Sequence, residues 1–441
     1  MSLSSLVSMA YIVFIFGYGF LCSKKQGANK PPSLFIATAS LCAAFIGGGF
    51  SLGNAQSGFS AGISGGILLL GFSFGQLLSA FLFAPLFSSF PNAHTVGDII
   101  KISFGETAKR FSGLLSVVFC IGILGAQINA FGSVAAYLFG FDRVICSLVG
   151  FSGIIAFAAL GGIRASQKSD ALQVTALFIG LSLAFILSFQ RVGGLSGLAA
   201  LSPPLFFALP PFSAKEFISP FCTFMLGELL CPPSVSRLLL SQNKLIAKRS
   251  SALSALLSAP FFIVTSLIGI LSRALSFTAQ AEYAMPSLIN EALVFPLNAV
   301  FLGAMLSVYL SSGCAFLLSC SDALYFDLLL KNQTEQPRDL VFFRLSAVVC
   351  GGLALILSLA FNGVLSILIL AYCFWCPIML VPLILSLKKK RYSKRVFFLA
   401  CGASVTVLLT WKALGEPFGI SAILAGLTAS FAAFILSKEV P

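Results

Sequence analysis

Long apolar stretches, separated by short polar breaks, recur along the chain from Leu6 to Leu436. Each is about 20 residues long, the length that an α-helix needs to cross the hydrocarbon core of a bilayer. They are apolar all round, whereas a membrane-spanning β-strand alternates polar and apolar residues. The pattern therefore predicts an all-α polytopic membrane protein with about 13 transmembrane helices, held in the lipid bilayer.

Composition strengthens this prediction. Hydrophobic residues make up 58% of the 441 residues and charged residues only 9%, whereas a soluble domain carries roughly 25% charged residues. The net charge of +13 would suit a nucleic-acid partner, but the basic residues lie in short loops and do not form a folded basic surface. We therefore expect no nucleic acid among the partners.

The basic residues instead indicate orientation. With the N-terminus outside, all but five of the 27 Lys and Arg residues fall on the cytoplasmic side, as the positive-inside rule requires. The five exceptions are Arg143, Arg191, Lys215, Arg273 and Lys412. We predict a multi-pass protein of the inner (plasma) membrane with a cytoplasmic C-terminus. The first stretch, Leu6–Cys22, is expected to remain uncleaved, because no basic segment precedes it.

A linker rich in Gly and Pro separates two halves of five expected helices each. The predicted units are an extra helix with an inside loop (1–32), a first repeat (33–190), an outside linker (191–216), a second repeat (217–387) and two C-terminal helices (388–441). The charge bias gives the first helix of each half opposite directions, as an inverted repeat requires.

The first helix of each half is also interrupted, one at Gly47-Gly48-Gly49 and the other at Gly227 and Pro232-Pro233. Interrupted helices at matching positions of inverted halves indicate a transporter's binding site near the middle of the membrane. The plainer alternative is that Gly serves close packing between membrane helices.

Several motifs together resemble one family. The run from Gly161 to Gln173, GGIRASQKSDALQ, resembles the signature of the sodium:solute symporter family. Further similar segments follow in family order: Thr95–Asp98 with Phe104-Gly105, Ala126-Gln127-Ile128, Pro232 with Arg237, and Ser311-Ser312 with Cys320-Ser321 and Asp327. The resemblance implies a leucine-transporter-type fold with a 5+5 inverted-repeat core and broken first and sixth core helices. It also implies Na⁺-driven uptake of a small solute.

Oxygen ligands for Na⁺ are expected on one helix. Val308, Ser311 and Ser312 stand at i, i+3 and i+4 and so share a helical face, and Na⁺, a hard cation, prefers oxygen ligands. The resemblance adds the facing carbonyls of Ala43 and Ile46. The alternative is that the two hydroxyls bond back to the preceding turn of their own helix.

Two carboxylates receive specific expectations. The resemblance places Asp170 on the cytoplasmic exit path of the sodium ion, and the alternative is a helix N-cap at a wet interface. Asp327 is expected to be solvated or paired with Lys331. No cluster of His and acidic residues indicates a metal other than sodium.

The predicted substrate site lies at the two breaks and comprises Gly48, Phe50, Gln127, Glu228 and Cys231. Sugar-transporting members of the family carry Gln after the first break, where this chain has Phe50, so a sugar is disfavoured. Glu228 is expected near the middle of the membrane, where an unpaired charge is expensive. Either the substrate supplies a positive group, or Glu228 is protonated and donates a hydrogen bond, or it is merely solvated at the break.

We therefore expect a Na⁺-coupled secondary symporter that imports a small organic solute, amino-acid-like or vitamin-like, by alternating access. An H⁺-coupled or uncoupled transporter, in which Glu228 or Asp170 takes up the proton, is the first alternative. A membrane sensor or enzyme is less favoured, because the last helix is followed by no signalling domain and no reactive side chains cluster at one depth. We expect no enzyme activity, Na⁺ as the coupling ion and no obligatory protein partner.

Overall fold

The computed structural model describes residues 2–25, 32–241, 243–329, 340–361 and 363–437. Lys331, the partner expected for Asp327, lies outside these residues. Every regular element in the described part is helical, with α-helices joined by short 3₁₀ or π segments labelled η. The prediction of an all-α protein is therefore confirmed.

In chain order, the elements up to the linker are α1 (Leu3–Lys25), α2 (Leu34–Phe45), α3 (Gly48–Ala61), α4 (Ser64–Leu82), η1 (Ala84–Ser89), α5 (Val96–Phe104), α6 (Glu106–Phe139) and α7 (Arg143–Arg191). Next come α8 (Gly194–Leu201), η2 (Pro204–Phe207), η3 (Ala214–Ile218), α9 (Ser219–Gly227), α10 (Pro232–Ser241), α11 (Lys244–Ala274), η4 (Ala281–Tyr283), α12 (Ala284–Ala292), α13 (Leu297–Asp322) and η5 (Ala323–Leu329). The last are α14 (Leu340–Ala360), α15 (Val364–Leu387), α16 (Lys394–Ala413), η6 (Pro417–Gly419) and α17 (Ala422–Ile435).

The described helices are long and apolar enough to cross a membrane many times. Eight qualify singly, or ten if each of two bent pairs is one span, and three shorter apolar helices accompany them. Two of the five helices expected in the first repeat, over residues 144–163 and 171–189, fall within the single helical element α7. The protein is thus a multi-pass membrane protein, while the number of crossings stays a prediction.

Both expected interruptions are present. The axes of α2 and α3 differ by 52° across Ile46 and Gly47, and those of α9 and α10 by 49° across residues 228–231. The second break contains Leu230 with φ of +57°, in the left-handed region that non-glycine residues rarely occupy. Pro232 starts α10, a position that proline tolerates because the first helical N–H groups have no partner within the helix.

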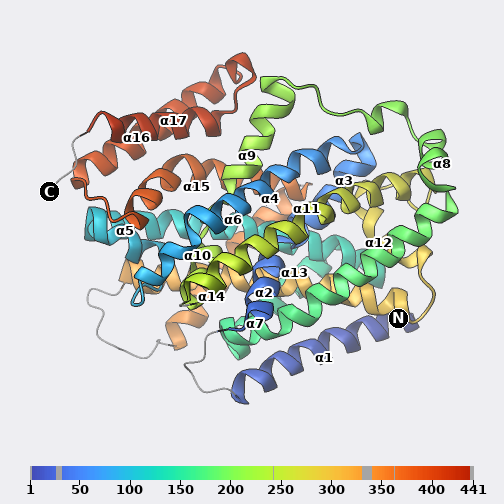
Figure 1. Cartoon of the computed structure of the whole chain (residues 1–441). Coiled ribbons are helices and arrows are strands. Elements are labelled where there is room, and N and C mark those ends of the chain that lie inside the picture. The colour runs from blue at the N-terminus through green and yellow to red at the C-terminus, as the bar shows by residue number, and fades with distance from the viewer. Residues whose placement is uncertain (1, 26–31, 242, 330–339, 362, 438–441) are drawn as a thin grey trace.

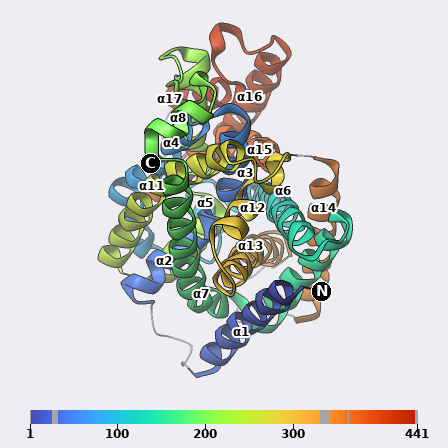
Figure 2. The ribbon, with the colours of Figure 1, turned by 90° about the vertical axis from the view of Figure 1, so that its right-hand side faces the viewer.

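Helix α13 lies in the middle of the bundle, in contact with α1, α2, α6, α7, α10, α12 and α14 (Figures 1 and 2). Almost all of its length is buried, so a polar residue on α13 must face other protein. At one edge α16 and α17 form a hairpin that packs on α15, and at another edge α1 packs on α7 and α13. This arrangement surrounds both breaks with helices.

Candidate functional site

Helix α13 contacts the first break through Ser312. Its hydroxyl donates a hydrogen bond of 2.5 Å to the carbonyl oxygen of Ala43, which belongs to the last turn of α2. Ile46 and Val308, the other expected carbonyl ligands on these two elements, are fully buried. The hydroxyl does not bond back to its own helix, so that alternative is wrong for Ser312.

The backbone at this break approaches the surrounding side chains closely. A Cβ at Gly47 would lie 2.5 Å from Gln127 Oε1 and 2.8 Å from Ser312 Oγ, so a larger residue here would displace both side chains. Gln127 on α6 accepts a hydrogen bond of 2.7 Å from the backbone N–H of Gly48. An added Cβ at Gly48 would clash with Ala130. The break, Gln127 and Ser312 therefore meet at one point in the protein interior.

Ser311 points the other way, toward α7. Its hydroxyl donates a hydrogen bond of 2.5 Å to Asp170 Oδ1 and lies 3.0 Å from the hydroxyl of Ser166. Asp170 is fully buried, and Ser40 on α2 donates to its second oxygen at 2.9 Å. A cap at a wet interface is therefore wrong for Asp170, because its neighbours are side chains of other helices.

Arg237 on α10 completes this cluster, although it was not among the predicted site residues. Its Nε donates a hydrogen bond of 2.9 Å to Ser40 Oγ, and Nη2 lies 3.8 Å from Asp170 Oδ2. Both side chains are almost fully buried. A charged residue within a membrane helix marks a functional site by default. The presence of an arginine in this apolar segment could therefore have identified Arg237 from the sequence.

The second break holds Glu228 against Tyr372, whose ring lies beside other aromatic rings. Glu228 is 2% exposed and accepts one hydrogen bond, of 3.3 Å, from the hydroxyl of Tyr372 on α15. The ring centroids of Phe119 and Trp375 are 5.3 Å apart, and those of Phe119 and Tyr372 are 6.5 Å apart. The buried indole N–H of Trp375 has no hydrogen-bond partner among the described residues. Tyr372 and Trp375 were not anticipated, since nothing local in the sequence links α15 to the break.

The other two expected substrate residues have different surroundings. Cys231 is fully buried, with its sulfur 3.0 Å from the hydroxyl of Ser234. Phe50 packs into an aromatic cluster, with its ring 4.8 Å from that of Phe72 and 5.6 Å from that of Phe262. The structure therefore gathers Gly48 and Gln127 at the first break and Glu228 and Cys231 at the second.

A separate buried cluster corrects the expectation for Asp327. This residue is 1% exposed, so it is not solvated. Thr95 donates to its Oδ1 at 2.6 Å, and Lys109 Nζ lies 3.9 Å away. Lys109 also pairs with Asp98 at 2.7 Å. The cluster holds η5, which follows α13, against α5 and α6 and lies apart from both breaks in sequence and contacts.

Comparison with known proteins decides the family. The sequence profile of the sodium:solute symporter family matches residues 28–403, most of the chain. The chain belongs to the sodium:solute symporter family. The resemblance predicted from the motifs is thereby confirmed, as is Na⁺ as the coupling ion of the family. No curated protein sequence matches the chain.

Solved structures agree on the fold. A Na⁺-coupled sialic acid symporter in a substrate-bound outward-open state superposes with a TM-score of 0.79 at 16% identity, over 100% of this chain and 99% of that one. A nucleobase-cation-symport-1 family transporter with bound bromovinylhydantoin gives 0.63 at 14% identity, over 93% and 95%. MhsT in complex with L-phenylalanine gives 0.55 at 14% identity, over 93% and 99%. The leucine-transporter-type fold is therefore confirmed, and at these identities the likeness concerns the fold alone.

Proposed function

We propose that this sodium:solute symporter imports a small organic solute carrying a protonated amine, an amino-acid-like or vitamin-like molecule and not a sugar, by alternating access. One observation carries the proposal. Neutral oxygen atoms that can bind a cation lie at the first break, and the buried carboxylate of Glu228 lies at the second break of the same bundle. The proposed setting is the plasma membrane, with the N-terminus outside and the C-terminus in the cytoplasm.

The proposed sodium ligands are the carbonyls of Ala43, Ile46 and Val308 and the hydroxyls of Ser311 and Ser312. The contact between Ser312 and Ala43 supports this set, because it joins two of the oxygens across the break. A Cβ at Gly47 would intrude on the same place. Three backbone carbonyl oxygens and two hydroxyls suit a hard monovalent cation. The hydroxyl of Ser311, which donates to Asp170 in this structure, has to turn toward the break to complete the set. The residues present therefore fit Na⁺.

Asp170 is proposed to receive the ion as it leaves toward the cytoplasm. Its carboxylate is hydrogen-bonded directly to Ser311, so a cation that leaves the hydroxyls meets a negative charge next. Arg237 partly offsets that charge from 3.8 Å, which keeps Asp170 from holding the ion permanently. This is the electrostatic arrangement that an exit path needs.

The proposed substrate contacts are Gly48, Phe50, Gln127, Glu228 and Cys231. Glu228 makes no ion pair with any described residue, and a lone charge at membrane depth costs roughly 2.5 kcal/mol or more. A substrate ammonium group would supply the missing positive charge. The faces of Phe119, Tyr372 and Trp375 attract cations as well, and they suit an apolar group beside the amine.

The second candidate is a transporter of the same family coupled to H⁺, with Glu228 as the proton carrier. The same lack of a basic partner among the described residues supports it. The two candidates differ in what occupies the carboxylate, an amine or a proton. Only the first makes binding depend on the charge of the solute.

The test is a thermal-shift screen of the purified protein with amine-bearing solutes and their neutral analogues, with and without Na⁺. We expect amines to stabilise the protein only with Na⁺, and Glu228→Gln to abolish the shift. Glu216→Gln is the matched control, because Glu216 lies in η3, just before α9, and is exposed. If neutral solutes stabilise the protein and still do so in Glu228→Gln, the proposal that the solute carries an amine is refuted. If solutes bind equally well with and without Na⁺, the proposed coupling to Na⁺ is refuted.

A further inference from the structure

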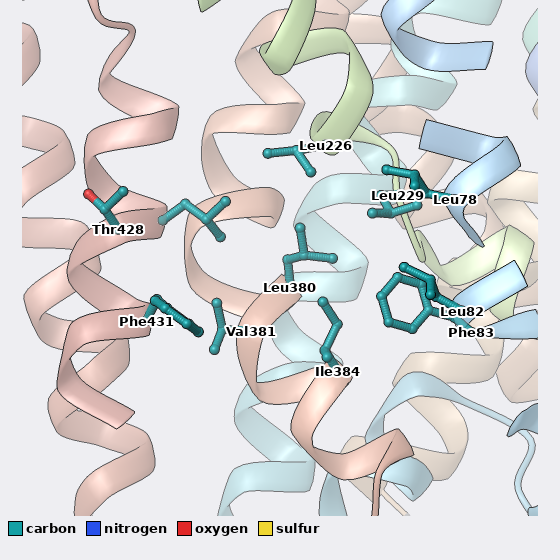
Figure 3. Close-up of a pocket in the computed structure, with 11 residues that line it drawn as sticks. Leu78, Leu82, Phe83, Leu226, Leu229, Leu380, Val381, Ile384, Thr428 and Phe431 are labelled. Carbon is teal, nitrogen blue, oxygen red and sulfur yellow. The ribbon is translucent and has the colours of Figure 1, made fainter. Parts of the chain in front are cut away.

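An apolar groove opens between α4, α9, α15 and α17 (Figure 3). Its volume of about 320 Å³ is at the lower end of the range for small-molecule sites. All lining side chains except that of Thr428 on α17 are apolar. The groove is separate from the proposed sodium and substrate residues, none of which lines it.

The groove has a buried floor and open walls. Leu229 and Leu380, on the floor, are 3% and 2% exposed, whereas Leu82 and Phe431, on opposite walls, are 55% and 56% exposed. The walls therefore open sideways, away from the bundle. In a protein that spans a membrane, the medium beside such walls is hydrocarbon, so the groove admits an apolar chain in preference to water.

The lower end of the groove leads to positive charge. Val381, Ile384 and Lys388 stand at i, i+3 and i+7, so they share one face of α15. The backbone N–H of Lys388 donates to the carbonyl of Ile384 at 3.2 Å, so helical geometry extends to the lysine. Lys388 is exposed and lies four residues, about 6 Å along the helix axis, beyond the groove residue Ile384.

Lys388 begins a basic run of exposed residues: Lys388, Lys389, Lys390, Arg391, Lys394 and Arg395. In the proposed orientation this run faces the cytoplasmic leaflet, which carries the anionic lipids of the membrane. The groove thus pairs an apolar slot at the depth of acyl chains with cations at the depth of headgroups.

We propose that the groove binds one acyl chain of an anionic phospholipid from the inner leaflet, with the headgroup phosphate against Lys388 and the basic run. The upper end of the groove is formed by Leu226 and Leu229, which flank Glu228 at the second break. A bound acyl chain therefore contacts the element that an alternating-access transporter has to move. The lipid site does not depend on which solute is carried.

The test is native mass spectrometry of the purified full chain titrated with phosphatidylglycerol or phosphatidylcholine. The wild type is expected to retain one phosphatidylglycerol in preference to phosphatidylcholine. Lys388→Gln is expected to weaken phosphatidylglycerol about fivefold and phosphatidylcholine less, because choline offsets the charge of its phosphate. Thr428→Trp fills the groove and is expected to reduce both lipids.

Matched controls lie on α16. Leu409→Trp adds the same side chain at an exposed apolar position outside the groove, and Lys412→Gln removes an exposed charge at the opposite end of the hairpin. Both are expected to bind lipid as the wild type does. Equal affinity of the wild type for the two lipids would overturn the proposal. Wild-type binding of phosphatidylglycerol by either Lys388→Gln or Thr428→Trp would overturn it as well. A wild-type dimer that Thr428→Trp dissociates would assign the groove to a second copy and also overturn it. Lys388 is at the surface, so its variant tests the site even if Thr428→Trp is unstable.

Discussion

Removal of the Ser312 hydroxyl tests the proposed sodium site most directly. The hydroxyl lies 2.5 Å from the carbonyl of Ala43 and has no exposure to solvent. Ser312→Ala therefore removes one of five proposed oxygen ligands without opening the site. An interaction between a neutral hydrogen-bonding group and a charge contributes about 1.5–3 kcal/mol. That range corresponds to a rise of roughly 10- to 150-fold in the Na⁺ concentration needed for half-maximal effect.

The same substitution has a smaller effect on folding. A side-chain hydrogen bond between membrane helices contributes only about 0.6 kcal/mol on average. The expected signature is thus a large loss of Na⁺ affinity with little loss of folded protein. The assay follows the melting temperature of the purified protein as Na⁺ replaces K⁺ at constant ionic strength, because an ion that binds the folded state raises its stability with concentration.

Ser254→Ala is the matched control. Ser254 on α11 is also buried, but its hydroxyl donates to the carbonyl of Ser251 in its own helix at 2.9 Å. This variant is expected to keep the wild-type Na⁺ response. If Ser312→Ala and Ser254→Ala respond to Na⁺ alike, the Ser312 hydroxyl is only a link between α13 and α2 and the ligand assignment is refuted.

The proposed site and the proposed topology support three further predictions. Asp170→Asn is expected to slow turnover in vesicles while Na⁺-dependent binding of the solute is kept, and an unchanged turnover rate would remove Asp170 from the exit path. Glu228→Gln is expected to lose selectivity for amines over neutral analogues; a variant with wild-type selectivity would show that the carboxylate does not contact the solute. In a cysteine-free background, Arg191→Cys should react with an impermeant reagent only from outside and Arg249→Cys only from inside, and the reverse result would invert the topology.

Local sequence patterns predicted the features that depend on neighbouring residues. Apolar stretches fix membrane helices because backbone groups must be satisfied within each helix. The glycines at 47–49 and the prolines at 232–233 marked both breaks. Glycine interrupts helices because its backbone is unusually free, and proline does so because it lacks the backbone N–H. The spacing of Ser311 and Ser312 gave their helical face, although it did not reveal that the two hydroxyls point to different partners.

Long-range packing determined what the sequence did not predict. Tyr372 reaches Glu228 across 144 positions of sequence, and Asp327 meets Thr95 across 232. No periodicity links such positions, because their proximity depends on the complete arrangement of helices. Asp327 was expected at a solvated helix end, and the error arose because α5 and α6 cover that end. Phe50 similarly faces the rings of Phe72 and Phe262, which belong to two other helices.

The surroundings of Asp170 have a consequence for the opening of the inner side. Its carboxylate is tied to α2 through Ser40, and Ser40 in turn accepts from Arg237 on α10. These two helices are the halves of the broken pairs that the proposed orientation places toward the cytoplasm. Moving α10 away separates Arg237 from Asp170, and the loss of one partner of a buried ion pair costs about 3–5 kcal/mol. Moving α2 away breaks the hydrogen bond that the neutral Ser40 hydroxyl donates to the same carboxylate. Water that enters behind the moving half repays that cost by solvating both groups. Under the proposed alternating access, opening of the inner side therefore depends on hydration, because bonds to water have to replace those that hold α2 and α10 to Asp170.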